Sequence, residues 1–327
     1  MMNLRTENDI IKNWSMNENN EPMISIVCHT FNHGKYIEQA ITSFLKQNTT
    51  YPFEIIIHDD ASTDNTVSII QSFQEKYPKI IKLILQDENK YSKKINIWTN
   101  FTFPLSKGKY IAICEGDDYW TDESKLQKQV DFLEQNKEYV VCWTDYLNYN
   151  GTDFKENDFG FNQEMVSIDF NNIFNPYCTY SLTTVFLKSA LDIELLSSLK
   201  KIKDNSLYTL LLRNGNGVFM NIKTAVYRIH EGGVYSLKSL YFQRYSSYLN
   251  LKEIYDLVPE SHTKNIEKTL ETLKRNAAFE ALKIKYTSNE VTEEQSELIE
   301  KYFSKASLPI LFKYYKRIFQ YKFLKKK

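Results

Sequence analysis

One stretch of the sequence decides the fold: Tyr110-Ile111-Ala112-Ile113-Cys114-Glu115-Gly116-Asp117-Asp118-Tyr119-Trp120. It begins as an apolar run, which is typical of a buried strand, and the run ends abruptly in acidic residues. These neighbouring carboxylates repel one another and resist burial, so a positive partner is expected, and a hard divalent cation is the best candidate. The stretch therefore predicts an α/β protein in which a strand stops at a site for metal-dependent phosphate chemistry.

The rest of residues 23–237 alternates between strand and helix patterns. Short apolar runs predict strands, and apolar stripes with helical spacing predict helices between them. The predicted strands are 24–28, 53–57, 80–85, 110–113, 140–143 and 185–187, and the predicted helices fall within 36–45, 67–77, 126–133 and 207–212. Such alternation favours parallel strands that are joined by right-handed crossovers.

Polar side chains follow three of these strands. Thr30 and Asn32 follow the first strand, Asp59 and Asp60 follow the second, and the acidic cluster at 115–118 follows the strand 110–113. In an open parallel sheet, ligands bind beyond the carboxyl ends of the strands. The three polar clusters are therefore expected to converge on one cleft.

Bulk composition narrows the class of protein. The 327 residues carry 41 basic and 41 acidic side chains, so the net charge gives no argument for nucleic acid, and no nucleic-acid partner is predicted. The four cysteines have no paired or zinc-like spacing, which favours small core residues in a reducing compartment. The sequence shows no run of 18 apolar residues and no signal peptide, so we expect a cytoplasmic protein, or one attached only to a membrane surface.

Three regions are predicted along the chain. Residues 1–22 are polar and predict a flexible N-terminal arm, residues 23–237 hold the catalytic domain, and helical periodicity dominates 238–327. The segment 301–327 has nine basic residues and no acid, interleaved with apolar side chains. We interpret residues 306–327 as a basic amphipathic tail that suits the anionic inner face of the cytoplasmic membrane; the alternative is a helix packed on the domain with a solvated basic face.

Five motifs in order resemble bacterial family-2 glycosyltransferases. They are Thr30-Phe31-Asn32, Asp59-Asp60-Ala61-Ser62-Thr63-Asp64, Glu115-Gly116-Asp117-Asp118-Tyr119-Trp120, Lys125-Leu126-x-x-Gln129 and Tyr227-Arg228-Ile229-His230-Glu231-Gly232-Gly233. The resemblance covers 23–237. It implies a GT-A-type fold, with a Rossmann-like, mostly parallel sheet flanked by helices. It also implies a nucleotide-sugar donor, Mn²⁺ or Mg²⁺, and inversion at the anomeric carbon.

The same resemblance implies roles for single residues. Those placed at the donor are Thr30, Asn32, Asp59, Asp60, Glu115, Asp117, Asp118, Arg228 and His230. Asp117 is the preferred metal ligand, with Glu115 and His230 as further ligands, although the family usually carries Asp where this chain has Glu115. One of the paired aspartates would contact the nucleotide base or ribose. Arg228 or His230 would reach the diphosphate or the metal from a loop that closes over the donor.

Asp204 is the predicted catalytic base, because family members carry an acid here to deprotonate the acceptor hydroxyl. The alternative for Asp204 is an ordinary helix N-cap, for which aspartate is favoured. Residues 175–184 would shape the acceptor pocket, with Thr183 and Thr184 as candidate contacts.

The predicted function is an inverting, metal-dependent hexosyl transfer that builds bacterial surface polysaccharide in the cell envelope. The favoured donor is a UDP-sugar, and the acceptor is a glycan or a lipid-linked oligosaccharide. Two alternatives stay open. A nucleotidyltransferase that makes sugar nucleotides would usually carry a glycine-rich basic loop after the first strand, where this chain has only Gly34. A non-catalytic module that binds nucleotide sugars is the other.

Overall fold

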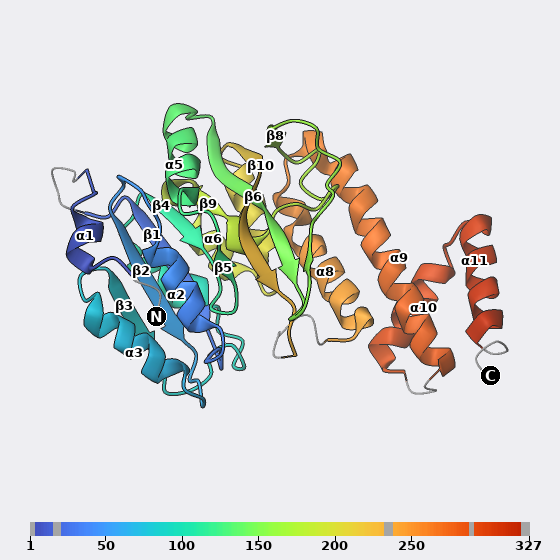
Figure 1. Ribbon diagram of the computed structural model, residues 1–327. Coiled ribbons are helices and arrows are strands. Elements are labelled where there is room, and N and C mark those ends of the chain that lie inside the picture. The colour runs from blue at the N-terminus through green and yellow to red at the C-terminus, as the bar shows by residue number, and fades with distance from the viewer. Residues whose placement is uncertain (1–3, 16–20, 232–237, 288–290, 322–327) are drawn as a thin grey trace. The chain divides into compact units, whose positions relative to one another are not determined.

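The computed structural model describes residues 4–15, 21–231, 238–287 and 291–321 (Figure 1). The chain divides into two compact units, Met1–Gly232 and Gly233–Lys327. The predicted boundary after residue 237 and this division both fall on residues 232–237, which lie outside the described residues. Each unit is described by itself.

The first unit is built on one mixed sheet. In its described residues, the strand order is β3-β2-β1-β4-β9-β6-β10-β5, with β7 beside β6 and β8 beside β10 (Figure 1). The strands are β1 (Ile24–Thr30), β2 (Phe53–Asp59), β3 (Ile81–Leu85), β4 (Tyr110–Ile113), β5 (Tyr119–Trp120), β6 (Tyr139–Tyr149), β7 (Phe154–Lys155), β8 (Met165–Ile168), β9 (Val185–Leu187) and β10 (Asn216–Arg228). The predicted α/β class with a Rossmann-like half is confirmed.

Strand direction changes across the sheet. The strands β1, β2, β3 and β4 pair in parallel, as their alternation with helices predicts. Beyond β4 the pattern differs from the prediction, because β9 inserts between β4 and β6 and runs antiparallel to both. The long β10 then pairs in parallel with β6 and antiparallel with β5. The pairing of β10 with β5 ties the acidic stretch to the end of β10.

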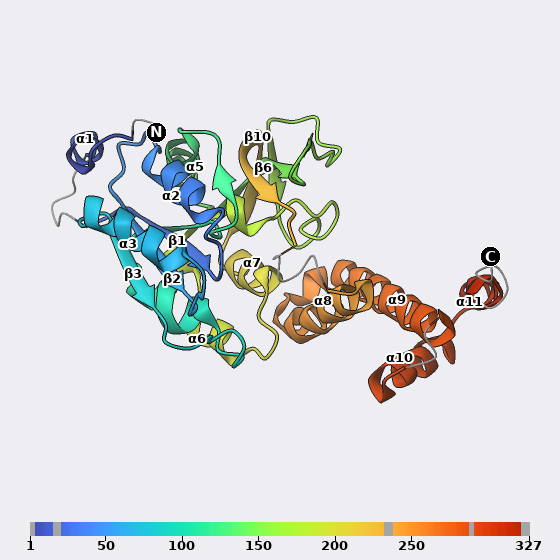
Figure 2. The same cartoon turned by 60° about the horizontal axis from the view of Figure 1, so that its bottom comes forward.

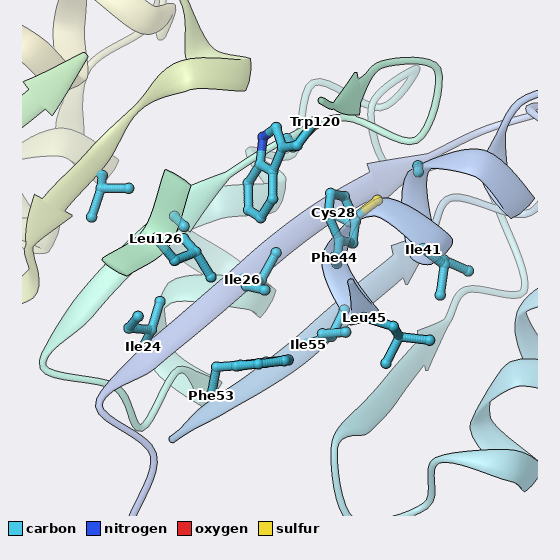
Figure 3. Close-up of a cluster of buried hydrophobic side chains, with 14 of the residues drawn as sticks. Ile24, Ile26, Cys28, Ile41, Phe44, Leu45, Phe53, Ile55, Trp120 and Leu126 are labelled. Atoms are coloured by element: carbon cyan, nitrogen blue, oxygen red, sulfur yellow. The ribbon is translucent and has the colours of Figure 1, made fainter. Parts of the chain in front are cut away.

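Helices cover both faces of the sheet. One face packs against α2, α3 and α5 in a single hydrophobic cluster, and Figure 3 shows part of it, where the Phe44 and Trp120 rings lie 4.7 Å apart. On the other face, the Phe103 ring meets Phe186 of β9 and the Tyr208 ring of α7 meets Trp143 of β6. The helical elements of this unit that follow β1 are α2 (Ile37–Leu45), α3 (Thr66–Lys76), η1 (Trp98–Thr102), α4 (Phe103–Leu105), α5 (Lys125–Gln135), η2 (Ser181–Thr183), η3 (Lys188–Ala190), α6 (Ile193–Ser198) and α7 (Asp204–Leu212).

The N-terminal segment differs from the predicted flexible arm. Residues 4–15 contain the short helix α1 (Glu7–Ile11), which Thr6 caps. Ile10 is buried in the main core, and the Trp14 ring lies 5.2 Å from that of Phe53. The segment is polar on average, so its composition gave no sign of these few apolar side chains. Their burial against the sheet stabilises the position of the segment.

The second unit is a helical array (Figure 2). Its described helical elements are α8 (Leu240–Ile254), η4 (Tyr255–Leu257), η5 (Glu260–His262), α9 (Thr263–Thr287), α10 (Glu293–Phe303) and α11 (Leu308–Phe319). Ala277, Ala281 and Leu282 of α9 pack with Leu298 and Phe303 of α10, as the helical periodicity predicts. No helix in the described ranges is long and apolar enough to cross a membrane.

The cysteines behave as their spacing predicts. All four are buried and free, and they are Cys28, Cys114, Cys142 and Cys178. Burial raises the pKa of each thiol above its usual value, so these side chains are core residues and not reactive thiolates.

Candidate active site

The three polar clusters lie next to one another at the ends of β1, β2 and β4. The amide of Asn32 donates to Ser62 Oγ at 2.8 Å, and Asn32 Oδ1 accepts from the amide of Thr63 at 2.7 Å, which joins the loops after β1 and β2. The amide of Gly116 donates to the carbonyl of His29 at 2.8 Å, which joins the acidic stretch to β1. A Cβ at Gly116 would come within 3.0 Å of the Thr30 side chain, so glycine permits this close approach.

Asp59 and Asp60 are buried and hold the loops around them. Asp59 accepts hydrogen bonds from the amide of Ser62 at 2.9 Å and from its hydroxyl. Asp60 accepts from the amides of Lys90 and Tyr91 at 2.7 and 3.0 Å. Both carboxylates therefore order the loops after β2 and at 90–91, and any contact with a nucleotide would use lone pairs that these bonds leave over.

Thr30 and Asn32 form the rim at β1. The hydroxyl of Thr30 is buried, and no other described residue gives it a hydrogen-bond partner. Asn32 is exposed and has a φ of 56°, a conformation that asparagine tolerates better than most residues. An unpaired buried hydroxyl is costly, so a ligand atom at Thr30 would remove a penalty.

Asp117 and His230 form the central pair of the site. His230 Nε2 lies 3.0 Å from Asp117 Oδ2, and His33 Nε2 lies 3.7 Å from the same oxygen. Burial alone would raise the pKa of Asp117, but the bond from His230 and the charge of His33 outweigh burial and lower it. Asp117 is thus held as a carboxylate, the form that binds a cation.

Among the described residues, a metal-binding site with several protein ligands is not preformed. The described residues contain no group of three or more His, Cys, Asp or Glu side chains arranged to hold a metal ion. The structure therefore brings Asp117 and His230 together, as predicted, but does not add Glu115 as a third ligand. Mg²⁺ commonly takes one or two carboxylates and completes its shell with substrate phosphates and water, so an incomplete protein set still fits such an ion.

Arg228 and Asp118 have other partners than predicted. The buried Arg228 side chain donates to the carbonyl of Asp117 and to Gln39 Oε1, and its guanidinium lies 4.4 Å from the Tyr119 ring centre. Asp118 Oδ1 accepts from the amide of Arg228 at 2.8 Å. Arg228 and Asp118 thus fix the acidic stretch to the end of β10.

Glu115 and Asp204 form a second acidic pair. Asp204 is the first residue of α7 and Lys203 is the N-cap, so the N-cap alternative for Asp204 is wrong. Burial raises the pKa of Asp204 to about 6. Burial and then the charge of Asp204 raise the pKa of Glu115 to about 8, and Glu115 Oε2 accepts from Ser181 Oγ at 3.1 Å. A carboxylate of raised pKa at the cleft is suited to accept a proton.

Thr183 and Thr184 do not reach a pocket. Both side chains are fully buried, and their hydroxyls bond to the carbonyl of Tyr180 at 3.0 and 2.9 Å. Their prediction as acceptor contacts is therefore wrong. The apolar strand that follows is buried, so this segment lies in the core as well. There the threonine hydroxyls form hydrogen bonds with a nearby backbone carbonyl.

A family model now adds to this geometry. Residues 25–189, half of the chain, match the model described as glycosyl transferase family 2. The chain belongs to glycosyl transferase family 2. The match confirms the family that the five sequence motifs resemble, and it decides against the nucleotidyltransferase.

Curated relatives cover parts of the chain. An uncharacterized protein of Mycobacterium tuberculosis, Rv1520, is 44% identical over 37% of this chain and 34% of its own length, so the match spans about a third of that relative. The Escherichia coli UDP-Glc:α-D-GlcNAc-diphosphoundecaprenol β-1,3-glucosyltransferase WfaP is 29% identical over 65% of this chain and 79% of its own.

Solved structures support the fold. S. aureus TarS in complex with UDP-GlcNAc superimposes with a TM-score of 0.58 at 19% identity, over 91% of this chain and 81% of TarS. The mannosyltransferase PcManGT of Pyrobaculum calidifontis, in complex with GDP-Man and Mn²⁺, gives 0.55 at 14% identity, over 96% and 91%. At these identities the likeness shows the GT-A fold, which confirms the predicted fold class.

Two residues that contact the acidic stretch were not singled out from the sequence. His33 faces Asp117, and its Nδ1 is buried without a partner among the described residues. Ser181 bonds Glu115. His33 follows Asn32 directly in the turn after β1, so its place beside a predicted donor residue was a usable signal. Ser181 lies within residues 175–184, which were expected to shape the acceptor pocket, but only Thr183 and Thr184 were named there. Its approach to Glu115 depends on how β9 inserts into the sheet.

The Lys125-Leu126-x-x-Gln129 motif stabilises the segment that carries Ser181. Lys125 is fully buried. Its Nζ donates to Gln129 Oε1 at 2.6 Å and to the carbonyl of Thr183 at 3.3 Å. The same Nζ lies 4.4 Å from the Trp120 ring centre. Gln129 Nε2 donates to the same carbonyl at 2.9 Å. The pair ties α5 to η2, the segment that presents Ser181 to Glu115.

Lys125→Ala is expected to destabilise the protein by about 2–4 kcal/mol, because it leaves a cavity and removes a buried donor. Urea unfolding followed by circular dichroism measures this. Lys128→Ala is the matched control on the same helix. Its exposed side chain pairs with Asp122, so its loss should cost no more than about 1 kcal/mol. Equal losses for both variants would contradict the role of Lys125.

Proposed function

We propose that the protein transfers a hexosyl group, with inversion, from a nucleotide sugar to a glycan or lipid-linked oligosaccharide in bacterial surface polysaccharide synthesis. We favour a UDP-sugar as donor, a divalent cation as cofactor, and the inner face of the cytoplasmic membrane as location. The observation that carries the proposal is the acidic stretch 115–118, where Asp117 pairs with His230 and where burial and the charge of Asp204 raise the pKa of Glu115.

Relatives support the donor and the acceptor class. WfaP is named for UDP-glucose and a diphosphoundecaprenol-linked acceptor, and TarS was solved with UDP-GlcNAc. PcManGT, with GDP-Man and Mn²⁺, shows that the same fold also holds a guanine nucleotide. These names support a nucleotide sugar and leave UDP as our proposal for this chain. Thr30 and Asn32, with Asp59 or Asp60, would line its base and ribose.

Asp117 and His230 would hold the cation. The atoms that would do so are Asp117 Oδ2 and His230 Nε2, which already lie 3.0 Å apart. When bound, such an ion supplies Lewis-acid stabilisation of the charge on the leaving diphosphate. Hydrogen bonds from the amide and the guanidinium of Arg228 would keep the acidic stretch in place while Asp117 is engaged.

Asp204 would act as the general base. Its carboxylate takes the proton of an acceptor hydroxyl while that oxygen forms a bond to the anomeric carbon. The bond from the anomeric carbon to the donor phosphate breaks in the same displacement, and the nucleoside diphosphate leaves with its electron pair. A direct displacement of this kind inverts the anomeric configuration and needs no covalent intermediate.

Transfer should depend on pH through Asp204. Since burial raises its pKa to about 6, the carboxyl is protonated below that pH and cannot accept a proton. We expect kcat/KM to fall about tenfold for each pH unit below this value. Initial rates across a buffered series measure the profile. A flat profile well below pH 6 in the wild type would contradict the assignment, as would an unchanged acid limb in Asp204→Asn.

A nucleotide-release screen tests the proposed function. The full chain is incubated with Mn²⁺ and, in turn, UDP-, GDP- and dTDP-sugars without acceptor, and released nucleoside diphosphate is measured. Slow hydrolysis of a UDP-sugar that a chelator abolishes is the expected result. Release from a GDP- or dTDP-sugar alone would overturn the UDP proposal, and release that a chelator leaves unchanged would overturn the metal.

A further inference from the structure

Helix α11 (Leu308–Phe319) presents two different apolar faces. Ile310, Tyr314 and Ile318 pack against the core of the second unit, and the Tyr314 ring lies 4.3 Å from that of Phe303. A second stripe is uncovered: the exposed fractions of Leu308, Phe312, Tyr315 and Phe319 are 81%, 72%, 64% and 58%. Their spacing of four, three and four residues places them on one side of the helix.

This exposed stripe corrects the sequence interpretation. The apolar side chains interpreted as the membrane face are Leu311, Tyr314, Tyr315, Ile318 and Phe319, but the structure uses Tyr314 and Ile318 to anchor α11 to α9 and α10. Tyr315 and Phe319 belong to the uncovered stripe as interpreted, and the structure adds Leu308 and Phe312 to it. Helix α11 is anchored and still exposes two phenylalanines, a leucine and a tyrosine along one side. Such a surface is unusual for a protein in water, where large exposed apolar patches mark interaction sites.

Charge identifies the occupant of the stripe. Lys313 and Lys316 are exposed on the helix between the stripe residues, and residues 301–327 contain nine basic side chains and no acid. A second copy of the chain docked on the same stripe would bring like charges together. An anionic lipid surface offers the opposite charge and an apolar interior, and it suits a helix with aromatic side chains on one face and lysines beside them.

We propose that α11 is an interfacial membrane anchor, which inserts Leu308, Phe312, Tyr315 and Phe319 among the lipids of an anionic bilayer. The lysines extend toward the headgroups while the opposite face stays packed on α9 and α10. This binding does not depend on the proposed transfer reaction. It would bring the enzyme to the surface where a lipid-linked acceptor resides.

Flotation of the full chain with lipid vesicles tests the anchor, without donor or acceptor. Vesicles of phosphatidylcholine mixed with phosphatidylglycerol should carry the protein, and vesicles of phosphatidylcholine alone should carry much less. Phe312→Ser with Phe319→Ser should lower binding at least about tenfold. Lys313→Gln with Lys316→Gln should lower it about fivefold for each charge and weaken its salt dependence.

The matched control is Leu240→Ser with Phe242→Ser, which removes two half-exposed apolar side chains from α8 in the same unit. This variant should float like the wild type, and circular dichroism should show all variants folded. Wild-type protein that stays unbound, or a stripe variant that floats as well as the control, would overturn the anchor. A dimer in sedimentation velocity that the stripe variant alone abolishes, with no vesicle binding, would assign the stripe to a second copy instead.

Discussion

Asp204→Asn is expected to lower the transfer rate by about a hundredfold to ten-thousandfold while donor binding survives, because a general base acts only in the transition state. The amide keeps the size of the side chain and cannot take up the acceptor proton. The fold should hold, since Lys203 and not Asp204 is the N-cap of α7, and an acid in the first turn contributes about 1 kcal/mol at most. Steady-state kinetics and calorimetric titration of the donor separate rate from affinity.

Asp192→Asn is the matched control for this variant. Asp192 also stands at the start of a helix, α6, where it caps the amide of Leu195 at 2.8 Å, but it lies outside the acidic site. Its loss should change stability slightly and leave the transfer rate near that of the wild type. Donor affinity that falls with the rate in Asp204→Asn would show a binding role in place of proton transfer. A rate like that of the control would remove Asp204 from the mechanism.

Asp117→Asn is expected to reduce transfer on the order of a hundredfold or more, because a metal that stabilises the leaving group is worth several kcal/mol. Its second expected effect is on metal binding itself. Asp117 Oδ2 is the oxygen that both His230 and His33 approach, and an amide in its place offers no charge to a cation. Titration of Mn²⁺ in the presence of UDP, followed by electron paramagnetic resonance, measures the loss without an activity assay.

Asp122→Asn serves as the control for Asp117→Asn. Asp122 lies five positions further along, pairs with Lys128 and accepts from the amide of Ser124, so it belongs to the surface of α5. Mn²⁺ affinity and transfer should both stay near wild-type values. If Asp117→Asn binds Mn²⁺ as tightly as Asp122→Asn does, the cation is held elsewhere. If transfer also persists, the metal-dependent mechanism fails.

Much of the fold and the location of the site could be predicted from the sequence. The runs at 24–28, 53–57 and 110–113 became neighbouring parallel strands, and the polar residues after them meet at one edge of the sheet. Strand order could not be predicted in the second half, because β9 contributes only three residues and inserts between β4 and β6 from far along the chain.

The sequence by itself determined where the polar clusters of this protein gather, because each apolar run ends locally in polar residues and parallel strands bring those ends together. The tertiary structure decided which of the polar groups form hydrogen bonds within the protein. Asp60 accepts hydrogen bonds from the amides of residues 90 and 91, and Asp118 accepts one from the amide of Arg228. Thr183 is buried, and its carbonyl accepts from Lys125. Burial and hydrogen bonding depend on partners distant in the chain. Residue type and spacing therefore could not distinguish the polar side chains that stabilise the loops from those that are free to contact a ligand.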